Sequence, residues 1–302
     1  MTPPTHLHRR HWLTGLVTCV GAAGMVGCAA GPRPGPPERG RWLDAVSGEA
    51  LSTDQAWQRW RDCDVLLLGE HHDHPQHHAW RGEWLARLPG AIVVAEHLPS
   101  GARVTWGGDL LASLTTAGFE AQAWRWPLHQ GLFEPLQAAG LALWGGNASR
   151  ETVRAVARQG VAALPAELSA ALAGTDLSPA AQASLEADLQ RGHCGQLPVA
   201  RLPGMRWAQR ARDAAMGQAL LAARQAGGRP AVLVAGNGHV RRDWGVAQWL
   251  AARQPGLRVL SVGLLEEGEP TRDPAHDLLW ISPAMPRRPD PCATLVMPGA
   301  QR

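Results

Sequence analysis

Residues 65–73 read VLLLGEHHD, a short apolar run that ends at once in a glycine, a carboxylate and two imidazoles. Four more apolar runs of similar length follow, at residues 92–95, 141–144, 231–235 and 259–262. These runs are continuous rather than alternating, as expected of parallel strands that are covered on both faces. Helical segments separate them, which predicts an α/β fold with a doubly wound, mostly parallel sheet flanked by helices.

The segments between the runs have helical patterns. Residues 76–88 place two tryptophans and a leucine on one stripe, and residues 208–224 are rich in alanine and other strong helix formers. The segment at about residues 151–200 is also alanine-rich, is interrupted by two prolines in its first 42 residues, and has no convincing strand. We therefore expect a small helical insertion subdomain there. Near the end of the chain, residues 278–282 and 293–297 are predicted to pair as edge strands.

The N-terminal residues are typical of an exported protein. Residues 1–27 have a basic start, a weakly apolar stretch and small residues at their end, which predicts a signal peptide. Met-Val-Gly before Cys28 is similar to a lipobox, so Cys28 is expected to be lipidated, with an ordinary cleaved signal as the alternative. Residues 28–40 form a proline- and glycine-rich tether, residues 41–297 the α/β domain and residues 298–302 a tail. A double arginine leaves both the general secretory and the twin-arginine routes open.

Composition restricts the chemistry of the chain. Its 302 residues have a formal net charge of +3, which gives no electrostatic footprint for nucleic acid. All 29 basic residues are arginine, so a lysine nucleophile is excluded, and the chain contains no tyrosine. Outside the signal peptide and Cys28, three cysteines remain, at Cys63, Cys194 and Cys292. Three thiols permit at most one internal disulfide, and the sequence leaves the pairing open.

Polar side chains follow four of the apolar runs. Glu70 and His72 come after the first run, Glu96 after the second, Asn147 after the third and His239 after the fourth. Ligands bind outside the carboxyl ends of the strands in open parallel sheets. The sequence therefore predicts a ligand site that these side chains form together at one edge of the sheet.

Histidines are concentrated next to the first of these strand ends. Residues 71–78 contain five histidines in eight positions, a composition typical of metal or haem-iron binding, although a solvated loop would also explain it. His72 and His239 are the candidate ligands of a divalent metal. His129 and His193 are isolated imidazoles that fit a core or loop position equally well.

The same residues also fit a hydrolase, whereas a dinucleotide-binding protein is excluded. In a hydrolase, Glu70 or Glu96 would act as the general base toward a water molecule, with His72 and His239 orienting it or binding a metal. A dinucleotide-binding loop is excluded at residues 236–241, because Arg241 stands where the third glycine of that motif is required.

Two motifs resemble the ChaN family of haem-binding proteins. GEHHD at residues 69–73 is similar to the opening motif of the family, and GNGHVRRDWGV at residues 236–246 is similar to its closing motif. Segments between them resemble the family in the same order: residues 124–128, Asn147, residues 193–195 and residues 208–216. The resemblance extends over residues 40–297.

The resemblance implies a membrane-anchored lipoprotein that binds haem or iron and contributes to its acquisition, with two haems paired across a homodimer. Since Ala29 and Ala30 follow Cys28, it also implies an outer-membrane location facing the periplasm. The predicted ligand-binding set is Glu70, His71, His72, His77, His78, Glu96, Asn147, His239 and Arg241. Tyrosine ligation of haem iron is associated with the family, and without tyrosine the histidines of residues 71–78 are the first candidates, followed by His129 and His193. The alternative is a hydrolase similar to erythromycin esterase or the TraB group.

Overall fold

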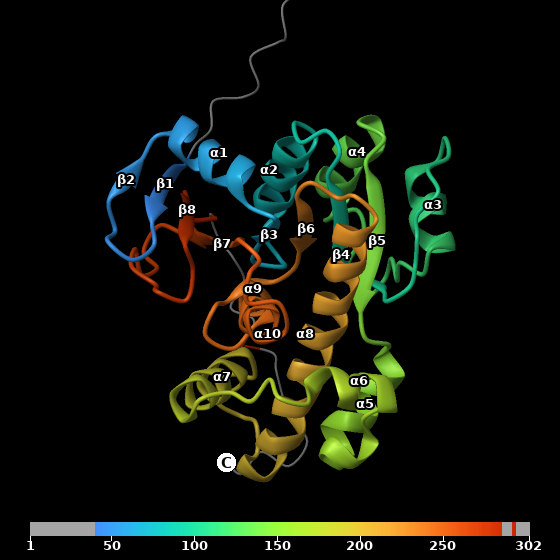
Figure 1. Cartoon of the computed structure of the whole chain (residues 1–302), viewed down its shortest axis with the longest axis vertical. Helices are drawn as coiled ribbons and strands as arrows, with labels where there is room; N and C mark the ends of the chain where they lie inside the picture. The colour runs from blue at the N-terminus through green and yellow to red at the C-terminus, as the bar shows by residue number, and fades with distance from the viewer. Residues whose placement is uncertain (1–39, 286–291, 294–302) are drawn as a thin grey trace, which may run out of the picture. The chain divides into compact units, whose positions relative to one another are not determined.

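The computed structural model describes residues 40–285 and 292–293, and within them eight strands form one mixed sheet in the order β2-β1-β8-β7-β3-β6-β4-β5 (Figure 1). The strands are β1 (Arg41–Asp44), β2 (Ala50–Leu51), β3 (Val65–Leu68), β4 (Ile92–Pro99), β5 (Ala142–Asn147), β6 (Ala231–Val234), β7 (Val259–Glu266) and β8 (Leu278–Ser282). Six neighbouring strands, from β8 to β5, are parallel, and β1 and β2 add an antiparallel hairpin at one side. The predicted fold class is confirmed.

Ten α-helices flank this sheet in the described part of the chain. Their bounds are α1 (Thr53–Asp62), α2 (Pro75–Leu85), α3 (Leu110–Thr116), α4 (Gln130–Ala138), α5 (Arg150–Gln159), α6 (Ala166–Leu172), α7 (Pro179–Gly192), α8 (Leu202–Gln225), α9 (Asn237–Val240) and α10 (Val246–Arg253). None of the helices in this part is both long and apolar enough to cross a membrane.

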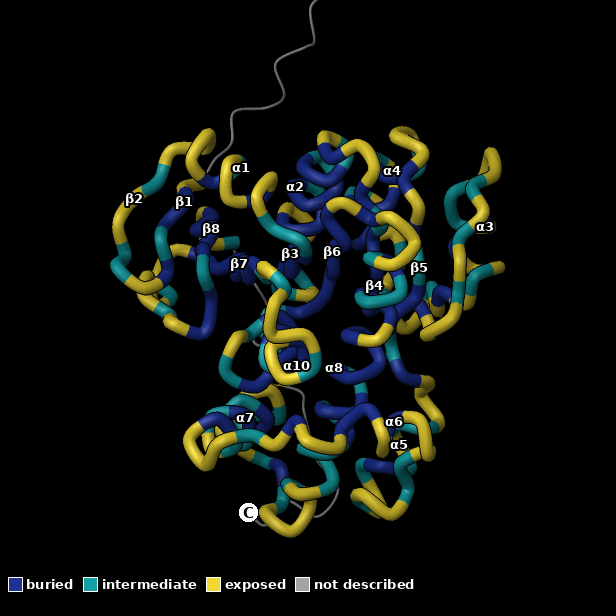
Figure 2. Tube along the Cα trace, viewed as in Figure 1, coloured by how far each residue is buried: buried dark blue, intermediate teal, exposed yellow. Residues whose placement is uncertain are grey.

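The central strand β3 explains why the apolar runs are continuous. Its four residues are fully buried, and it pairs in parallel with β6 on one side and β7 on the other. Leu66 and Leu68 pack into the core formed with α1, α2 and α4, whereas Val65 and Leu67 pack into the core formed with α6, α8 and α10. Both faces of the sheet are therefore dry around β3, and Figure 2 shows β3 and its neighbour β6 as buried.

Close backbone packing holds α2 against α4. A Cβ on Gly82 would lie 2.3 Å from the carbonyl oxygen of Gly131, so glycine is required where the two helices meet. At its other end, α2 begins at Pro75, with His74 as the N-cap that accepts a hydrogen bond from the backbone of His77 at 3.3 Å. This packing fixes the base of the histidine-rich segment.

The prediction of an edge pair near the end of the chain is wrong for its first strand. β8 is an inner strand, parallel to β7 and antiparallel to β1. The hairpin β1–β2 lies at the edge instead, and its strands of four and two residues are too short to show a strand pattern in the sequence. Most of residues 293–297 lies outside the described residues, as do the predicted signal peptide, Cys28 and the tail.

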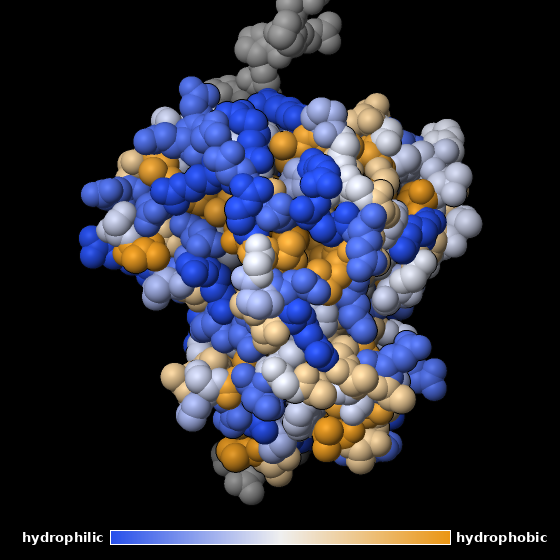
Figure 3. All heavy atoms as spheres, viewed as in Figure 1, coloured by the Kyte–Doolittle hydropathy of each residue, from blue (hydrophilic) through white to orange (hydrophobic). Residues whose placement is uncertain are grey.

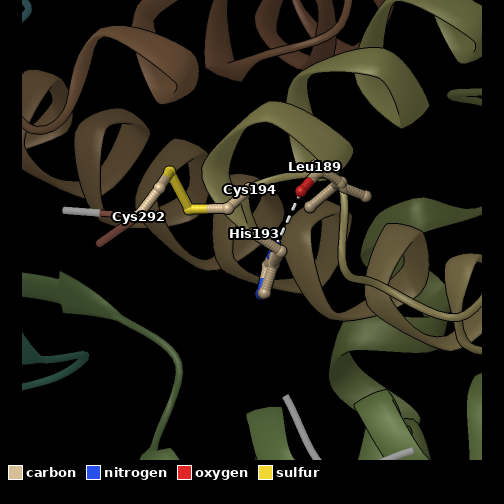
Figure 4. The surroundings of a disulfide bond; sticks show 4 residues. All are labelled: Leu189, His193, Cys194 and Cys292. Atoms are coloured by element: carbon tan, nitrogen blue, oxygen red, sulfur yellow. Dashed lines mark hydrogen bonds between the residues drawn. A yellow bond between two sulfur atoms is a disulfide. The ribbon is translucent and has the colours of Figure 1, made fainter. Parts of the chain in front are cut away.

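The alanine-rich insertion forms α5, α6 and α7, with no strand. Directly after α7 a disulfide joins Cys194 to Cys292, with 5.5 Å between the Cα atoms, while Cys63 is a free thiol. Figure 4 shows this bond beside His193, whose Nδ1 donates to the carbonyl oxygen of Leu189 at 2.7 Å. The disulfide therefore ties residues near the end of the chain to the insertion.

Candidate functional site

The carboxyl ends of the parallel strands deliver the predicted polar residues to one place. Glu70 follows β3, Glu96 lies within β4, and His239 lies in the short helix α9 directly after β6. These residues line a cavity of about 660 Å³ together with His72, Trp124 and His129. A second cavity of about 510 Å³ shares Glu96 and Trp124 with it and reaches Asn147 at the end of β5. The convergence of Glu70, His72, Glu96 and His239 follows directly from the parallel topology.

Glu70 is the centre of the first half of the site. Its carboxylate is 2% exposed and pairs with the buried guanidinium of Arg81. His72 and His78 donate to it through their Nδ1 atoms, at 2.7 and 2.8 Å. The Nε2 atoms of His97 and His129 lie 3.7 and 3.8 Å from the same carboxylate. One carboxylate is thus surrounded by four imidazoles and one guanidinium.

Most of these basic groups are neutral because they are buried. Burial lowers the pKa of His78 to about 4 and that of His129 to about 2, and it brings the pKa of His97 well below its usual value. Burial also lowers the pKa of Arg81 to about 9, which leaves its guanidinium charged at neutral pH. Arg81 therefore supplies the positive charge that balances a Glu70 carboxylate, and the buried imidazoles of His78, His97 and His129 act as dipoles.

Glu96 is the centre of the second half. It pairs with Arg212, accepts a hydrogen bond from the backbone N–H of Gly236 at 2.8 Å, and lies 3.5 Å from Nε2 of His239. Burial would raise the pKa of Glu96, but the charges of His239, His72 and Arg212 outweigh it and hold the pKa well below the usual value. Glu96 is consequently an ionised carboxylate that attracts cations.

His239 connects Glu96 to a third carboxylate. Its Nδ1 donates to Asp213 at 2.6 Å. Burial lowers the pKa of His239, but the charges of Glu96 and Asp213 raise it more, so that the pKa lies above its usual value. Burial also raises the pKa of Asp213. An Asp213–His239–Glu96 chain of this kind fixes the orientation of the imidazole.

His72 stands between the two halves and faces the cavity. Its side chain is 44% exposed, whereas those of His78, His97 and His129 are almost fully buried. While Nδ1 is held by Glu70, Nε2 lies 3.8 Å from Glu96 and points into the site. A Cβ on Gly236 would approach this Nε2 to 2.7 Å, so a side chain at this position would displace the imidazole. His72 is the accessible imidazole of the group.

Comparison with known proteins identifies the family. Residues 56–250 match the family model described as haem-binding uptake, Tiki superfamily, ChaN. The chain belongs to the ChaN family. A solved structure described as cofacial haem binding to ChaN of Campylobacter jejuni aligns with 81% of this chain and 97% of its own, at 17% identity and a TM-score of 0.63, which shows a common fold. A succinoglycan biosynthesis protein aligns with 76% of this chain and 73% of its own, at 12% identity and a TM-score of 0.38. No curated protein matches the chain.

Other predicted residues of this ChaN-family chain lie around the cavity or outside it. His71 lines the cavity, where its Nε2 pairs with Glu269 at 2.8 Å. His77 is fully buried and turned the other way, with its Nε2 3.1 Å from the hydroxyl of Ser282. Arg241 lines neither cavity and pairs with carboxylates of the neighbouring loops.

Asn147 contacts both members of the Glu96–Arg212 pair. It donates to the main-chain oxygen of Glu96 at 2.9 Å and accepts from Arg212 at 3.1 Å. It therefore orients the Glu96–Arg212 pair.

The site also contains residues that the sequence analysis did not single out: Arg81, His97, Gln209, Arg212 and Asp213. Two of them carry a signal in the sequence. Gln209 and Asp213 are four residues apart, so they share one face of α8, and both contact His239. Arg81 carries no such signal. In the sequence alone, an arginine that the fold buries on the apolar face of a helix cannot be distinguished from an exposed arginine.

Proposed function

We propose that this chain binds haem in the cavity at the carboxyl edge of the sheet, with Nε2 of His72 as the axial ligand. The observation that carries the proposal is the state of His72: an exposed imidazole whose Nδ1 is bonded to Glu70 at 2.7 Å and whose Nε2 faces the cavity. Iron-ligating histidines commonly donate their other ring N–H to a carboxylate or carbonyl, which fixes the tautomer and raises ligand basicity. The haem-binding description of the family supports this assignment.

The cavity also fits the rest of a haem. Trp124 lies beside His72, with ring centroids 5.5 Å apart, and offers an aromatic face to a planar macrocycle. Arg125 and Arg212 line the same cavity and are suited to pair with propionate groups. Its volume of about 660 Å³ is within the range of ligand pockets, roughly 300–1,000 Å³.

We further propose that the protein is a lipoprotein anchored through Cys28 at the outer membrane, facing the periplasm, where it contributes to haem or iron acquisition. The sequence of residues 1–40 supports this location, and the uptake role named in the family description supports the task. Anchoring would hold a haem carrier at the surface through which iron passes. Pairing of two haems across a homodimer is part of the same proposal, since the solved ChaN structure is described by cofacial haem binding.

The test is a haemin titration of the full chain, followed by the Soret absorbance. His72→Ala is expected to abolish the saturable shift, while His193→Ala, which removes an imidazole outside the cavity, leaves it unchanged. Replacing all five histidines of residues 71–78 would be less informative, because three of them are buried and support the fold. Circular dichroism checks that each variant is folded. Saturable binding that survives His72→Ala would refute His72 as the ligand, and no saturable shift in the wild type would refute haem binding.

A second function is favoured by one specific observation. Glu70, His72 and His129 each offer a ligand atom, and these atoms lie within 4.8 Å of one another. Nδ1 of His129 donates to the carbonyl oxygen of Trp124 at 2.9 Å, which leaves Nε2 unprotonated and directed toward Glu70. A divalent metal bound by these residues would suit a hydrolase.

In that case Glu70 rather than Glu96 is our candidate for the general base, because the low pKa of Glu96 makes it a weak base. Metal analysis of the purified chain and an ester-hydrolysis panel with Glu70→Gln test this candidate. Activity that is metal-dependent and lost in the variant would support it. A chain that binds no divalent metal and hydrolyses no ester would exclude it.

A further inference from the structure

A third cavity lies at the opposite edge of the sheet, where the parallel strands begin. Asp64 lines it directly before β3, Pro230 directly before β6 and Arg258 directly before β7. Its volume is about 350 Å³. Glu70 is the sixth residue after Asp64, so the two sites are up to about 20 Å apart along the strand. The cavity is therefore distinct from the candidate haem site.

The residues that line this cavity carry a large excess of positive charge. The charged residues that line it are Arg61, Arg87, Arg224, Arg229, Arg258 and Asp64. Asp64 accepts from Arg224 at 2.8 Å and from Arg258 at 3.2 Å, so this carboxylate is shared between two guanidinium groups. Cys63 also lines the cavity, and burial raises the pKa of its thiol to about 12, so that it contributes no negative charge. Five positive charges thus face one negative charge.

Three of the arginines keep their charge uncompensated. Arg61 bonds to the neutral side-chain oxygen of Gln58 at 3.0 Å. The side chains of Arg87 and Arg229 make neither a hydrogen bond nor an ion pair with any residue that the structure describes. Figure 3 shows that hydrophilic side chains dominate the surface around α1, from which Arg61 comes. Uncommitted guanidinium groups around one hollow repel one another unless an anion lies between them.

We propose that this cavity is a binding site for a phosphate group. A phosphate monoester has a charge of about −1.5 to −2 and three strong acceptor oxygens, which matches three guanidinium groups that carry no ion pair among the described residues. Arginine is suited to this role because its planar fork binds phosphate through two parallel hydrogen bonds. Trp57, Leu88 and Pro230 form an apolar wall beside the arginines, which fits an organic substituent on the phosphate. Two sources provide this chemistry: a soluble phosphorylated molecule and the headgroup of an acidic phospholipid.

Calorimetric titration of the full chain with phenyl phosphate and with inorganic phosphate tests the site. Cys28→Ala is included so that no acyl chain contributes to binding. Phenyl phosphate is expected to bind more tightly than inorganic phosphate because of the apolar wall. Replacing Arg87 and Arg229 together by glutamine should weaken its binding by at least about tenfold, since hydrogen bonds to charged groups contribute strongly. Both side chains are exposed, so the fold should be unaffected.

The matched control replaces Arg158 and Arg272 by glutamine, which removes the same charge from exposed positions outside the cavity. This control should bind phenyl phosphate as the parent chain does. An equal loss in both double variants would mean that only net charge matters and would overturn the proposal, as would the absence of saturable binding.

Vesicles distinguish the two sources. If the ligand is a lipid headgroup, vesicles of equal parts phosphatidylcholine and phosphatidic acid should compete with phenyl phosphate for the site. Vesicles of phosphatidylcholine alone should not compete. Saturable binding of phenyl phosphate without such competition identifies a soluble ligand.

Discussion

Replacing His97 by leucine should make the protein less sensitive to acid. His97 is fully buried beside Glu70, its two ring nitrogens have no hydrogen-bond partner among the described residues, and its ring packs against Trp124 at 4.3 Å. Burial holds its pKa well below the usual value of 6.5. The unfolded chain therefore takes up a proton near pH 6.5, while the native state does not. This group stabilises the fold fully above pH 6.5, and its contribution is lost as the pH falls below that value.

The size of the effect follows from the linkage between protonation and folding. One proton bound only by the unfolded state changes the free energy of unfolding by about 1.4 kcal/mol per pH unit. Between pH 7 and pH 5, the wild type should therefore lose about 2 kcal/mol through His97 alone. His78, His129 and His276 have pKa values lowered in the same direction and add to the acid sensitivity of both proteins.

Urea unfolding of the ligand-free protein at a series of pH values measures this difference. The free energies of unfolding of His97→Leu and the wild type should diverge by about 2 kcal/mol in favour of the variant as the pH is lowered from 7 to 5. Phe133→Leu is the matched control: Phe133 contacts the same ring at 5.4 Å and does not titrate, so its effect should be the same at every pH. A constant difference between His97→Leu and the wild type would refute the assignment of His97 as a neutral buried imidazole.

Three further changes test particular contacts. Gly82→Ala should destabilise the fold by roughly 3 kcal/mol in urea unfolding, because the added methyl group meets the backbone of α4. Gly236→Ala should displace His72 and weaken haemin binding in a Soret titration, whereas Gly256→Ala, where nothing lies within 4 Å of the new Cβ, should bind as the wild type does. Cys194→Ser should lower the free energy of unfolding by roughly 2–5 kcal/mol through loss of a disulfide that spans 98 residues, and a reductant should produce the same loss in the wild type only.

The buried strands could be predicted from the sequence because burial on both faces leaves a continuous apolar run. All five predicted runs form strands of the sheet. The order of the strands in the sheet could not be predicted in the same way. An apolar run has the same pattern whichever strand lies next to it. This is why β8 was expected at an edge although it lies between β1 and β7. The hairpin β1–β2 was missed because strands of four and two residues are too short to show a pattern.

The candidate site was predictable to the extent that strand ends determine it. Glu70, His72 and His239 come after parallel strands, and Glu96 follows Ala95, the last residue of β4 that pairs with β6. The run of five histidines misled in one respect: a composition does not show which side chains face solvent. The helix α2 begins within this run, so its period turns His77 and His78 into the core. Only the three-dimensional arrangement separates buried imidazoles from exposed ones.

The imidazoles around Glu70 are of two kinds: His72 is exposed to the cavity, and the other three are buried. This difference indicates how a chain without tyrosine could bind haem iron. A tyrosinate ligand would bring a negative charge into a cavity where Glu96 is already ionised, whereas a neutral imidazole brings none. Of the imidazoles around Glu70, His72 alone combines an anchored Nδ1 with an Nε2 that reaches the cavity. The buried layer of His78, His97 and His129 faces the same carboxylate without a net charge, so Glu70 remains free to polarise His72. The absence of tyrosine is therefore compatible with the proposed haem binding, provided that Glu70 holds His72 in place.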